Sequence, residues 1–374
     1  MHEIIEVTQL KKELDQILLD LEDHIKTIGS ELTKPVNVDS SLITRTLPEI
    51  TRLSHKFRQF MPKAASARDL FVQRNGPLTP EQSNVWSQFN TSLSRYSTWI
   101  TSAPRIERLV RQQIPVERNT LYRNPSNVLN ATVSQLSVSD QIFENLHDIL
   151  NQNSQNDDAR DHGCFADIAL PQSVFIEHVH AAHRVLLAKR LRHPSRFLDV
   201  GCGGGLKVLS AANFFERADG LEFDPGYVAT AQQLFKASET GRCHVIDADG
   251  LTFENYGDYD VIYFYRPMRD PALLRQLEEQ IIQTAQPGTL IIAPYTMFDY
   301  RYAELGCGRI DGRLYITQTS QSDADALRRI AELTGVAVTR KVQDAVSIWT
   351  PIVEASRAKG FTFENDAEGY STLY

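Results

Sequence analysis

The stretch Leu198-Asp199-Val200-Gly201-Cys202-Gly203-Gly204-Gly205 decides the fold of this chain. Its apolar start is typical of the end of a strand, and its glycines mark a tight turn into a helix. Glycine has no Cβ, so Gly201, Gly203 and Gly205 permit a backbone that other residues avoid and let a ligand lie against the main chain. The N–H groups of such a turn and of the following helix favour a negatively charged ligand group. Taken alone, a glycine-rich turn does not identify that ligand.

Short strand-like and helix-like patterns alternate from residue 196 onward. In order they are RFLDV, LKVLSAANFF, ADGLEF, GYVATAQQLFKAS, CHVID, YDVIYFY, PALLRQLEEQIIQTA and TLIIAPY. This alternation predicts an α/β fold with a doubly wound, mostly parallel, Rossmann-like sheet and helices on both faces. Right-handed crossovers bring the carboxyl ends of the strands to one edge, where we expect the ligand. Residues 295–321 interrupt the alternation and predict a hairpin insertion.

The sequence before this region has the apolar spacing of helices. The first stripe consists of Val7, Leu10, Leu14, Ile17, Leu21 and Ile28. We therefore expect residues 1–150 to form an all-helical N-terminal domain that controls substrate access or forms a homodimer through its helices. Residues 151–163, NQNSQNDDARDHG, are polar and predict a linker. The α/β domain then covers residues 164–350, and residues 351–374 form a C-terminal tail.

Composition excludes several classes of protein. The 374 residues include 39 Lys and Arg against 47 Asp and Glu, a net charge of −8, and 42% of them are hydrophobic. The acidic balance disfavours a dedicated nucleic-acid protein, although Arg105, Arg108 and Arg111 on one helix face leave an anionic partner open. No stretch has the roughly 18 uninterrupted apolar residues of a membrane span, and the start does not read as a secretory leader. We expect a soluble cytoplasmic protein that does not bind membranes.

Acidic residues follow the next two strands at positions suited to a nucleotide. The dinucleotide pattern G-x-G-x-x-G/A fails here because Leu206 stands where it needs a small residue. Glu222 nevertheless ends the next strand, 222 − 205 = 17 residues beyond Gly205, where a carboxylate can hold ribose hydroxyls. Asp247 ends the strand after that, where an acid can accept a hydrogen bond from an exocyclic amine.

Together these motifs resemble those of the class I S-adenosylmethionine-dependent methyltransferase family. LDVGCGGG resembles the first motif, GLEFDP the second, IDADGLTF the third and YDVIYFYRPM the fourth. QPGTLIIA resembles the turn before the fifth strand, with Thr289 in place of the usual second glycine. The resemblance covers about residues 172–350, and its motifs agree in content, order and spacing.

The resemblance implies S-adenosyl-L-methionine as the cofactor. Glu222 would then bind the ribose hydroxyls, Asp247 and Ala248 would lie against the adenine, and Asp199 would orient the methionine portion. The complete set of cofactor-binding residues that it implies is Asp199, Gly201, Gly203, Gly205, Glu222, Phe223, Asp247, Ala248 and Tyr263.

The catalytic residues are not identified by the sequence, but three candidates stand out. Relatives that methylate amino groups of adenine, glutamine or cytosine carry an Asn/Asp-Pro-Pro-Tyr element after the fourth strand, and this chain lacks it. Tyr265 and Arg266, at the same place, suit an aromatic, planar or anionic substrate. His180 is the third candidate, as a base or a substrate contact. Its neighbours His178 and His183 cannot converge with it on one ion, so we expect no metal.

We therefore expect a methyltransferase that acts by in-line displacement on a nitrogen or oxygen acceptor. A small molecule is the favoured acceptor, and the sequence does not identify it. A protein or RNA acceptor is the alternative, and nucleic acid is the less expected partner. A non-catalytic, cofactor-binding interaction module is the third possibility, and the retention of Asp199, Glu222 and Asp247 counts against it.

Overall fold

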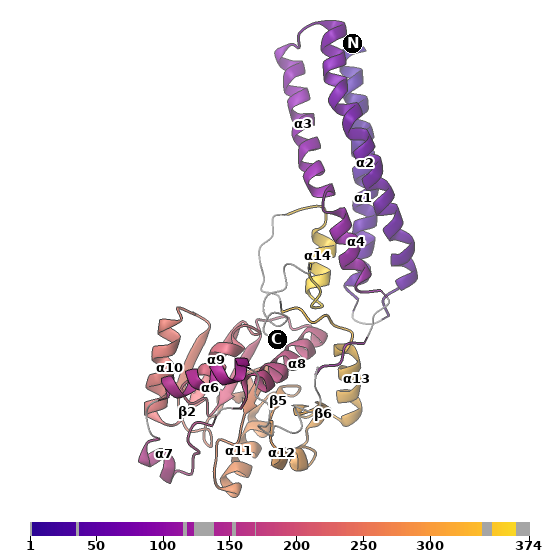
Figure 1. Cartoon of the computed structure of the whole chain (residues 1–374). Helices are drawn as coiled ribbons and strands as arrows, with labels where there is room; N and C mark the ends of the chain where they lie inside the picture. Colours follow the sequence, from indigo (N-terminus) through magenta and orange to yellow (C-terminus); the bar gives the residue numbers. More distant parts are fainter. Residues whose placement is uncertain are drawn as a thin grey trace. The chain divides into compact units, whose positions relative to one another are not determined.

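The structure, a computed structural model, describes residues 2–34, 37–114, 118–122, 138–151, 155–168, 170–338 and 346–363. The chain divides into two compact units, which are shown in Figure 1 and are described separately. The helical unit contains residues 1–117 and 339–367, and the α/β unit contains residues 118–338 and 368–374.

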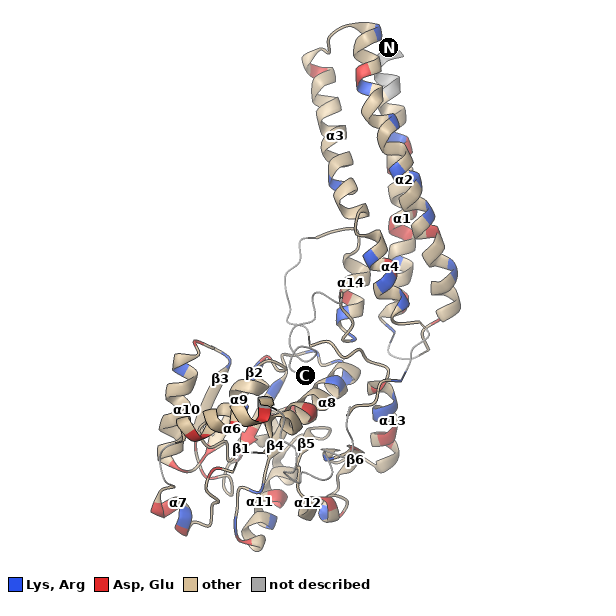
Figure 2. Ribbon diagram, in the orientation of Figure 1, with Lys and Arg blue, Asp and Glu red and all other residues tan. Residues whose placement is uncertain are grey.

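The helical unit has a single apolar core. Its helices are α1 (His2–Leu32), α2 (Ser40–Asn75), α3 (Pro80–Ile100), α4 (Ala103–Arg111) and α14 (Thr350–Arg357). The predicted stripe of α1 packs inside this core, where Ile17, Leu21 and Ile28 are fully buried. Charged residues of both signs lie along the outside of α1 and α2 (Figure 2). The stripe is therefore core of this unit rather than a free surface.

The C-terminal segment 351–374 was expected to be a separate tail, and the structure corrects this for its described part. Helix α14 packs against α1, with Ile352 and Ala355 buried in the helical core. The Trp349 side chain is also buried, and its Nε1 donates a hydrogen bond to the carbonyl of Trp99 at 2.7 Å. The apolar spacing of Trp349, Ile352 and Ala355 is what places this segment in the core.

The α/β unit contains one seven-stranded sheet. The strands are β1 (Arg196–Val200), β2 (Arg217–Glu222), β3 (Cys243–Asp247), β4 (Val261–Phe264), β5 (Leu290–Ile292), β6 (Gly308–Asp311) and β7 (Leu314–Ile316). Their order is β3-β2-β1-β4-β5-β7-β6, with parallel pairing from β3 to β5 and antiparallel pairing of β7 with β5 and β6. The α/β, doubly wound, mostly parallel prediction is confirmed.

Helices cover both faces of the sheet, and the strands alternate between two cores. One core includes α8 (Gln172–Lys189), α9 (Leu206–Ala211), α10 (Pro225–Ala237) and α13 (Gln321–Ala331). The other includes α11 (Pro271–Thr284), α12 (Thr296–Arg301) and the short 3₁₀ helix η1 (Asn255–Asp258). On β4, Tyr263 faces the first core and Phe264 the second, as strand alternation requires.

Residues 295–321 were expected to be an insertion, and they are instead part of the sheet. A hairpin is present as predicted, formed by β6 and β7. Leu314 and Ile316 of β7 pair with β5 and are buried, because the β5 edge would otherwise carry unpaired backbone groups. The segment therefore completes the sheet rather than projecting from it.

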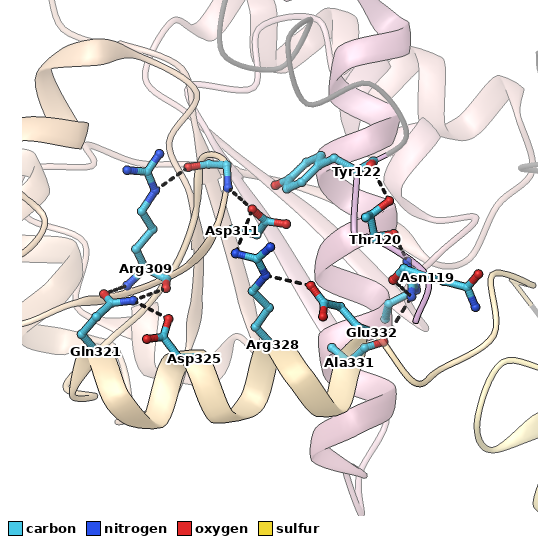
Figure 3. Close-up of polar contacts among 12 residues, drawn as sticks. Asn119, Thr120, Tyr122, Arg309, Asp311, Gln321, Asp325, Arg328, Ala331 and Glu332 are labelled. Atoms are coloured by element: carbon cyan, nitrogen blue, oxygen red, sulfur yellow. Dashed lines mark hydrogen bonds and ion pairs between the residues drawn. The ribbon is translucent and has the colours of Figure 1, made fainter. Parts of the chain in front are cut away.

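The predicted boundary at residue 150 is also corrected, because the α/β unit begins near residue 118. Figure 3 shows residues 119–122 bonded to the C-terminal end of α13, where the Asn119 N–H donates to the Glu332 carbonyl at 2.9 Å. The buried Arg184 of α8 donates to the carbonyls of Thr120 (2.6 Å) and Asn119 (2.9 Å). Tyr122 is buried in the sheet's first core. Residues 119–122 were expected to belong to the all-helical domain, but they form no helix and are held by these bonds instead.

The predicted linker, residues 151–163, is likewise part of the α/β unit where the structure describes it. Helix α6 (Val138–Leu150) packs on α8, and α7 (Asp157–Asp161) follows with Ala159 buried. Asn156 caps α7, and its backbone N–H donates to Asp224 at 2.7 Å. Asn and Asp residues that suggested a solvated linker therefore serve as caps and hydrogen-bond partners.

The basic face of α4 is partly used within the helical unit. Arg111 donates to Glu107 at 2.9 Å, and the guanidinium carbon of Arg105 lies 4.5 Å from the centroid of the Phe363 ring. Across the described residues, no helix has the length and apolarity needed to cross a bilayer.

Candidate functional site

The glycine loop lies at the carboxyl end of β1, as predicted. Gly201, Gly203 and Gly205 have φ angles of 77°, 53° and 83°, in the left-handed region that favours glycine. A Cβ on Gly203 would also overlap the Asp167 carboxylate, with 2.7 Å to Oδ1, and one on Gly201 would lie 2.8 Å from Pro267 Cβ. Both space and backbone conformation therefore require glycine at this turn.

Glu222, at the end of β2, is buried and holds the neighbouring turns together. Its Oε1 accepts hydrogen bonds from the N–H groups of Phe223 and Asp224, both at 2.9 Å, and its Oε2 accepts one from Gly203 at 2.8 Å. Burial raises the pKa of Glu222 to about 7, and the backbone N–H groups oppose that rise. Three of the roughly four lone-pair positions of this carboxylate are thus used, and the remaining one, on Oε2, can accept a hydrogen bond from a ribose hydroxyl.

Asp199 is 2% exposed and lies on β1 immediately before the loop. Its pKa is raised well above the ordinary range, first by burial and then by the charge of Asp167. Within the described part of the chain, no group donates a hydrogen bond to its carboxyl. A buried acid without a partner is costly, and this one faces a pocket where a ligand can supply the partner.

A solvent-open pocket extends from the glycine loop to the end of β4. Nine of the sequence-predicted residues line it: Asp199, Gly201, Gly203, Glu222, Phe223, Ala248, Tyr263, Tyr265 and Arg266. The residues brought together come from the ends of four adjacent strands. The edge of the sheet where we expected the ligand is therefore where the pocket lies.

Three predicted residues do not line this pocket. Gly205 is one turn deeper, where its Cβ position is filled by Phe235 and Ala231. Asp247 is exposed beside Glu222 in the β2–β3 register, and Asp249 lines the pocket instead.

His180 is the third, and the structure corrects its candidacy as a base. Its ring is buried on α8, 6.1 Å from the ring of Phe214, and its Nε2 lies 2.9 Å from the Val336 carbonyl. The face of α8 that carries His180 is therefore packed against other parts of the α/β unit and does not point toward the carboxyl ends of the strands.

The end of β4 forms the wall opposite the glycine loop. Arg266 has a φ of 49°, in a region that non-glycine residues rarely adopt. Its guanidinium carbon lies 5.4 Å from the centroid of the Phe165 ring. The Phe165 N–H donates to the Pro267 carbonyl at 3.0 Å, and the Arg269 N–H donates to the Gly163 carbonyl at 2.7 Å. Two hydrogen bonds to the segment 163–165 therefore hold the residues that follow Arg266 at the pocket wall.

A histidine that the sequence did not identify lies beside two residues of the pocket, Phe223 and Asp249. The His162 ring stacks on Phe223 with centroids 4.4 Å apart and an angle of 24° between the planes. His162 Nε2 lies 3.2 Å from Asp249 Oδ2. One face of Phe223 is therefore covered by the protein itself.

Lys207, on the first turn of α9, is a buried cation at the pocket. Its Nζ donates to the Leu170 carbonyl at 2.6 Å and to Gln172 Oε1 at 2.9 Å. It also lies 4.3 Å and 5.0 Å from the ring centroids of Phe143 and Phe175. Burial lowers the pKa of Lys207 to about 7. Sequence reasoning missed Lys207, although a basic residue so close behind the glycine loop was a signal that could have identified it.

His147 and Asp167 also line the pocket, and sequence reasoning missed both. Neither belongs to a motif, because α6 and the segment after α7 fold onto the loop from outside the region that the motifs cover. No spacing rule connects them with the glycine loop. Among the described residues, no group of three or more His, Cys, Asp or Glu side chains is placed to hold a metal ion.

Comparison with known proteins identifies the α/β unit. Residues 126–295 match the family model "Protein-L-isoaspartate(D-aspartate) O-methyltransferase". No curated protein matches the chain.

Solved structures with weaker likeness include several methyltransferases. An RNA methyltransferase from Salinibacter ruber, in complex with S-adenosyl-L-homocysteine, is 20% identical over 34% of this chain and 76% of its own, with a TM-score of 0.28. An amino pentose methyltransferase from Micromonospora echinaspora is 20% identical over 42% and 58%, with a TM-score of 0.26. PKMT2 from Rickettsia typhi is 15% identical over 30% and 24%, with a TM-score of 0.26.

Likenesses of this size carry no conclusion about the substrate, and the chain spans less than two thirds of the second and third of these proteins. The assignment stands on the family match, the sheet order and the glycine loop with Glu222 at its edge. The chain contains a class I S-adenosylmethionine-dependent methyltransferase domain.

Proposed function

We propose that this domain transfers a methyl group to a nitrogen or oxygen atom of a small molecule that carries a planar or anionic group. The single observation that carries the proposal is Arg266, a cation held in a strained backbone conformation at the pocket wall. Strained residues persist where function requires them, so the outlier supports a role in substrate binding.

The donor is bound, in this proposal, by the residues around the glycine loop. S-adenosylmethionine supplies a methyl group on a positively charged sulfur, which an acceptor attacks in line. Glu222 accepts hydrogen bonds from the ribose hydroxyls, while Phe223, Ala248 and Asp249 surround the adenine. Because the leaving group is already activated, these residues contribute mainly by holding donor and acceptor in reacting geometry.

Arg266 is suited to hold an acceptor carboxylate or phosphate, since its guanidinium offers paired donors. Stacking against Phe165 fixes its plane, and Tyr265 lies beside it in the pocket. A carboxylate acceptor needs no proton removed before attack, whereas a neutral amine or hydroxyl needs a base within hydrogen-bond reach. We therefore favour a carboxylate oxygen among the possible acceptors.

A carboxyl group of a protein is the second candidate acceptor. The family whose model matches residues 126–295 is named for O-methylation of isoaspartate and D-aspartate, both carboxyl compounds. The only support for an RNA acceptor is the basic face of α4. Arg111 and Arg105 of that face already have contacts within the helical unit, which weakens this support.

Radiolabelled methyl donor and fractionated cell extract test these alternatives. With a small-molecule acceptor, the filtrate contains a labelled compound that separates from the methyl donor by chromatography, whereas a protein or RNA acceptor retains the label above the filter. Methyl esters release volatile methanol in mild alkali, while N-methyl groups do not. Absence of transfer to every fraction, with donor bound, would contradict the proposal.

The variant Arg266→Ala tests whether Arg266 binds the acceptor. Arg269 provides a matched control, because its guanidinium carbon lies 5.7 Å from the same Phe165 ring but the residue does not line the pocket. We expect Arg266→Ala to raise KM for the acceptor at least tenfold and to leave donor affinity unchanged, since a charged hydrogen bond contributes about 1.5–3 kcal/mol. Arg269→Ala should change neither.

We further propose that the helical unit shapes substrate access or mediates a homodimer. The α1 stripe is core, so a dimer would use other side chains, and Leu19, Leu70 and Val85 are exposed at 62%, 46% and 43%. Light scattering of the wild type and of a Leu19→Glu, Leu70→Glu variant tests this. A monomeric wild type would rule out the dimer.

A further inference from the structure

Two acidic side chains lie beside the glycine loop, and one of them is outside every motif. Asp199 is the penultimate residue of β1, and Asp167 lies on the segment between α7 and α8. Both line the pocket, and the charge of Asp167 contributes to the raised pKa of Asp199. Like charges held together disfavour ionisation unless a positive group compensates them. This corner of the pocket therefore suits a cationic part of a ligand.

The Asp167 carboxylate is fixed through one of its two oxygens. Oδ2 accepts a hydrogen bond from the Gly204 N–H at 3.2 Å and another from Asn151 Nδ2, and it lies 3.1 Å from His147 Nε2. The hydrogen bond between His147 and Asp167 is the first cause of the raised pKa of His147, so this contact favours the charged imidazole. Within the described part of the chain, none of these bonds goes to Oδ1, so this oxygen remains for a ligand.

Helix α6 supports this arrangement from the side opposite the loop. Near its start, Asp140 accepts hydrogen bonds from the N–H and Oγ of Ser173 at 2.7 Å and 2.8 Å. One turn later Phe143 packs against the ammonium group of Lys207. The next turn carries His147, and Asn151 directly follows the helix. The position of Asp167 is therefore set by several anchored contacts rather than by one loop.

The resident cation cannot take the place of a ligand here. Lys207 already donates to the Leu170 carbonyl and to Gln172 Oε1, and Asp199 has no hydrogen-bond partner among the described residues. Asp199 is thus a buried carboxyl facing the pocket with its hydrogen-bonding capacity unused. The unused hydrogen-bonding capacity of Asp199 is a second observation, besides Asp167, that indicates a hydrogen-bond donor on a ligand.

We propose that Asp167 binds the α-ammonium group of the methyl donor's methionine portion, with Asp199 beside it, and that His147 and Asn151 position the Asp167 carboxylate. This inference rests on the proposed function. The methionine portion carries an ammonium and a carboxylate, and the two acids suit the ammonium. Asp167 thereby takes the ammonium role that the motifs alone assigned to Asp199.

Three probes separate the parts of the donor in calorimetric titrations of the full-length protein. S-adenosylhomocysteine carries both amino-acid charges, its des-amino analogue keeps only the carboxylate, and 5′-methylthioadenosine lacks the amino-acid portion. Wild-type protein should bind S-adenosylhomocysteine at least tenfold more tightly than the des-amino analogue, as expected for a charged hydrogen bond. Equal affinities in the wild type would overturn the inference before any variant is made.

Asp167→Asn should weaken S-adenosylhomocysteine binding at least tenfold and change the affinity for the other two probes less than twofold. His147→Gln and Asn151→Ala should each cause a smaller loss, again confined to S-adenosylhomocysteine. These two variants keep the test open if Asp167→Asn does not fold. An equal loss for all three probes, or no loss, would overturn the role of Asp167.

Glu222→Gln provides the contrasting variant, because a ribose contact is shared by all three probes. It should weaken binding of each of them to a similar extent. If the wild-type protein binds neither S-adenosylhomocysteine nor 5′-methylthioadenosine, the proposed function is refuted. If the wild type binds them and Asp167→Asn weakens all three probes equally, only the role of Asp167 is refuted.

Discussion

The two units of the chain treat ionisable groups in opposite ways. In the described part of the helical unit, a hydrogen bond from Lys34 lowers the pKa of Glu31, in favour of the charged form. At the methyltransferase pocket, burial shifts the pKa values of Asp199, Glu222 and Lys207 against their charged forms. Burying such groups costs stability. The helical unit is thus organised for stability, and the pocket gives up stability for binding.

Phe57→Ala should produce the largest change, and in the helical unit alone. The Phe57 side chain is 1% exposed in the core of that unit, and truncating a buried Phe typically costs about 3–5 kcal/mol. Chemical denaturation should show this loss, and titration with S-adenosylhomocysteine should show unchanged affinity. Arg58→Ala, at the exposed neighbouring position, is the control for the helix itself. A loss of ligand affinity in Phe57→Ala would mean that the two units are not independent.

Gly203→Ala should have the next largest effect, on the pocket. The residue has a φ of 53°, and its new Cβ would overlap the Asp167 carboxylate. Strain of about 1–3 kcal/mol together with this overlap predicts S-adenosylhomocysteine binding weaker by about 100-fold. Gly241 has no atom within 4 Å of its Cβ position and no positive φ, so Gly241→Ala should bind normally. Similar affinities for the two variants would show that the loop is not the binding site.

Glu222 predicts a pH dependence of binding. Its pKa is about 7 without ligand, and ribose hydroxyls donate to the ionised form, so binding releases a proton. Affinity for S-adenosylhomocysteine should therefore rise by up to about tenfold per pH unit below pH 7 and level off above it. Glu222→Gln should bind at least about tenfold more weakly at pH 8, with a flatter profile. The exposed Glu254 gives the control, since Glu254→Gln should keep the wild-type profile.

Lys207 predicts the smallest effect, on stability rather than on binding. Its pKa is about 7 in the folded protein and about 10.4 when unfolded, so between these values the unfolded chain holds a proton that the folded chain lacks. The free energy of unfolding should therefore rise with pH in this interval, by up to about 1.4 kcal/mol per unit. Urea denaturation at pH 7.5 and 8.5 measures the rise. It should be absent in Lys207→Met and present in Lys236→Met, whose side chain is exposed; equal rises would contradict the assignment.

Much of the sheet could be predicted from the sequence, because its signals are local. The order of strands and helices follows from apolar periodicity, and the sharp turn at Gly201 and Gly203 follows from glycine itself. Glu222 was identified because acids at strand ends reach the same edge of the sheet. The two-residue alternation of strands likewise accounts for Tyr263 and Phe264 of β4 facing opposite cores.

The other half of the site depends on contacts between segments that are distant in sequence. Asp167 and His147 reach the glycine loop because α6 packs on α8, and no periodicity encodes that packing. His180 was misjudged since its neighbours on α8, rather than its chemistry, decide which way it points. Residues 151–163 were misread because a polar segment that caps helices has the same composition as a polar linker.

The return of α14 to the helical unit has a consequence for synthesis of the protein. A ribosome releases the chain from the N-terminus, so α1 to α4 emerge before any of the sheet, and their partner helix α14 emerges only after β1 to β7 have been made. Until then the apolar surface that Ile352 and Ala355 will cover remains exposed on the nascent chain. The whole methyltransferase domain is translated in that interval. The core of the helical unit can therefore be completed only after the domain between its two parts has been translated.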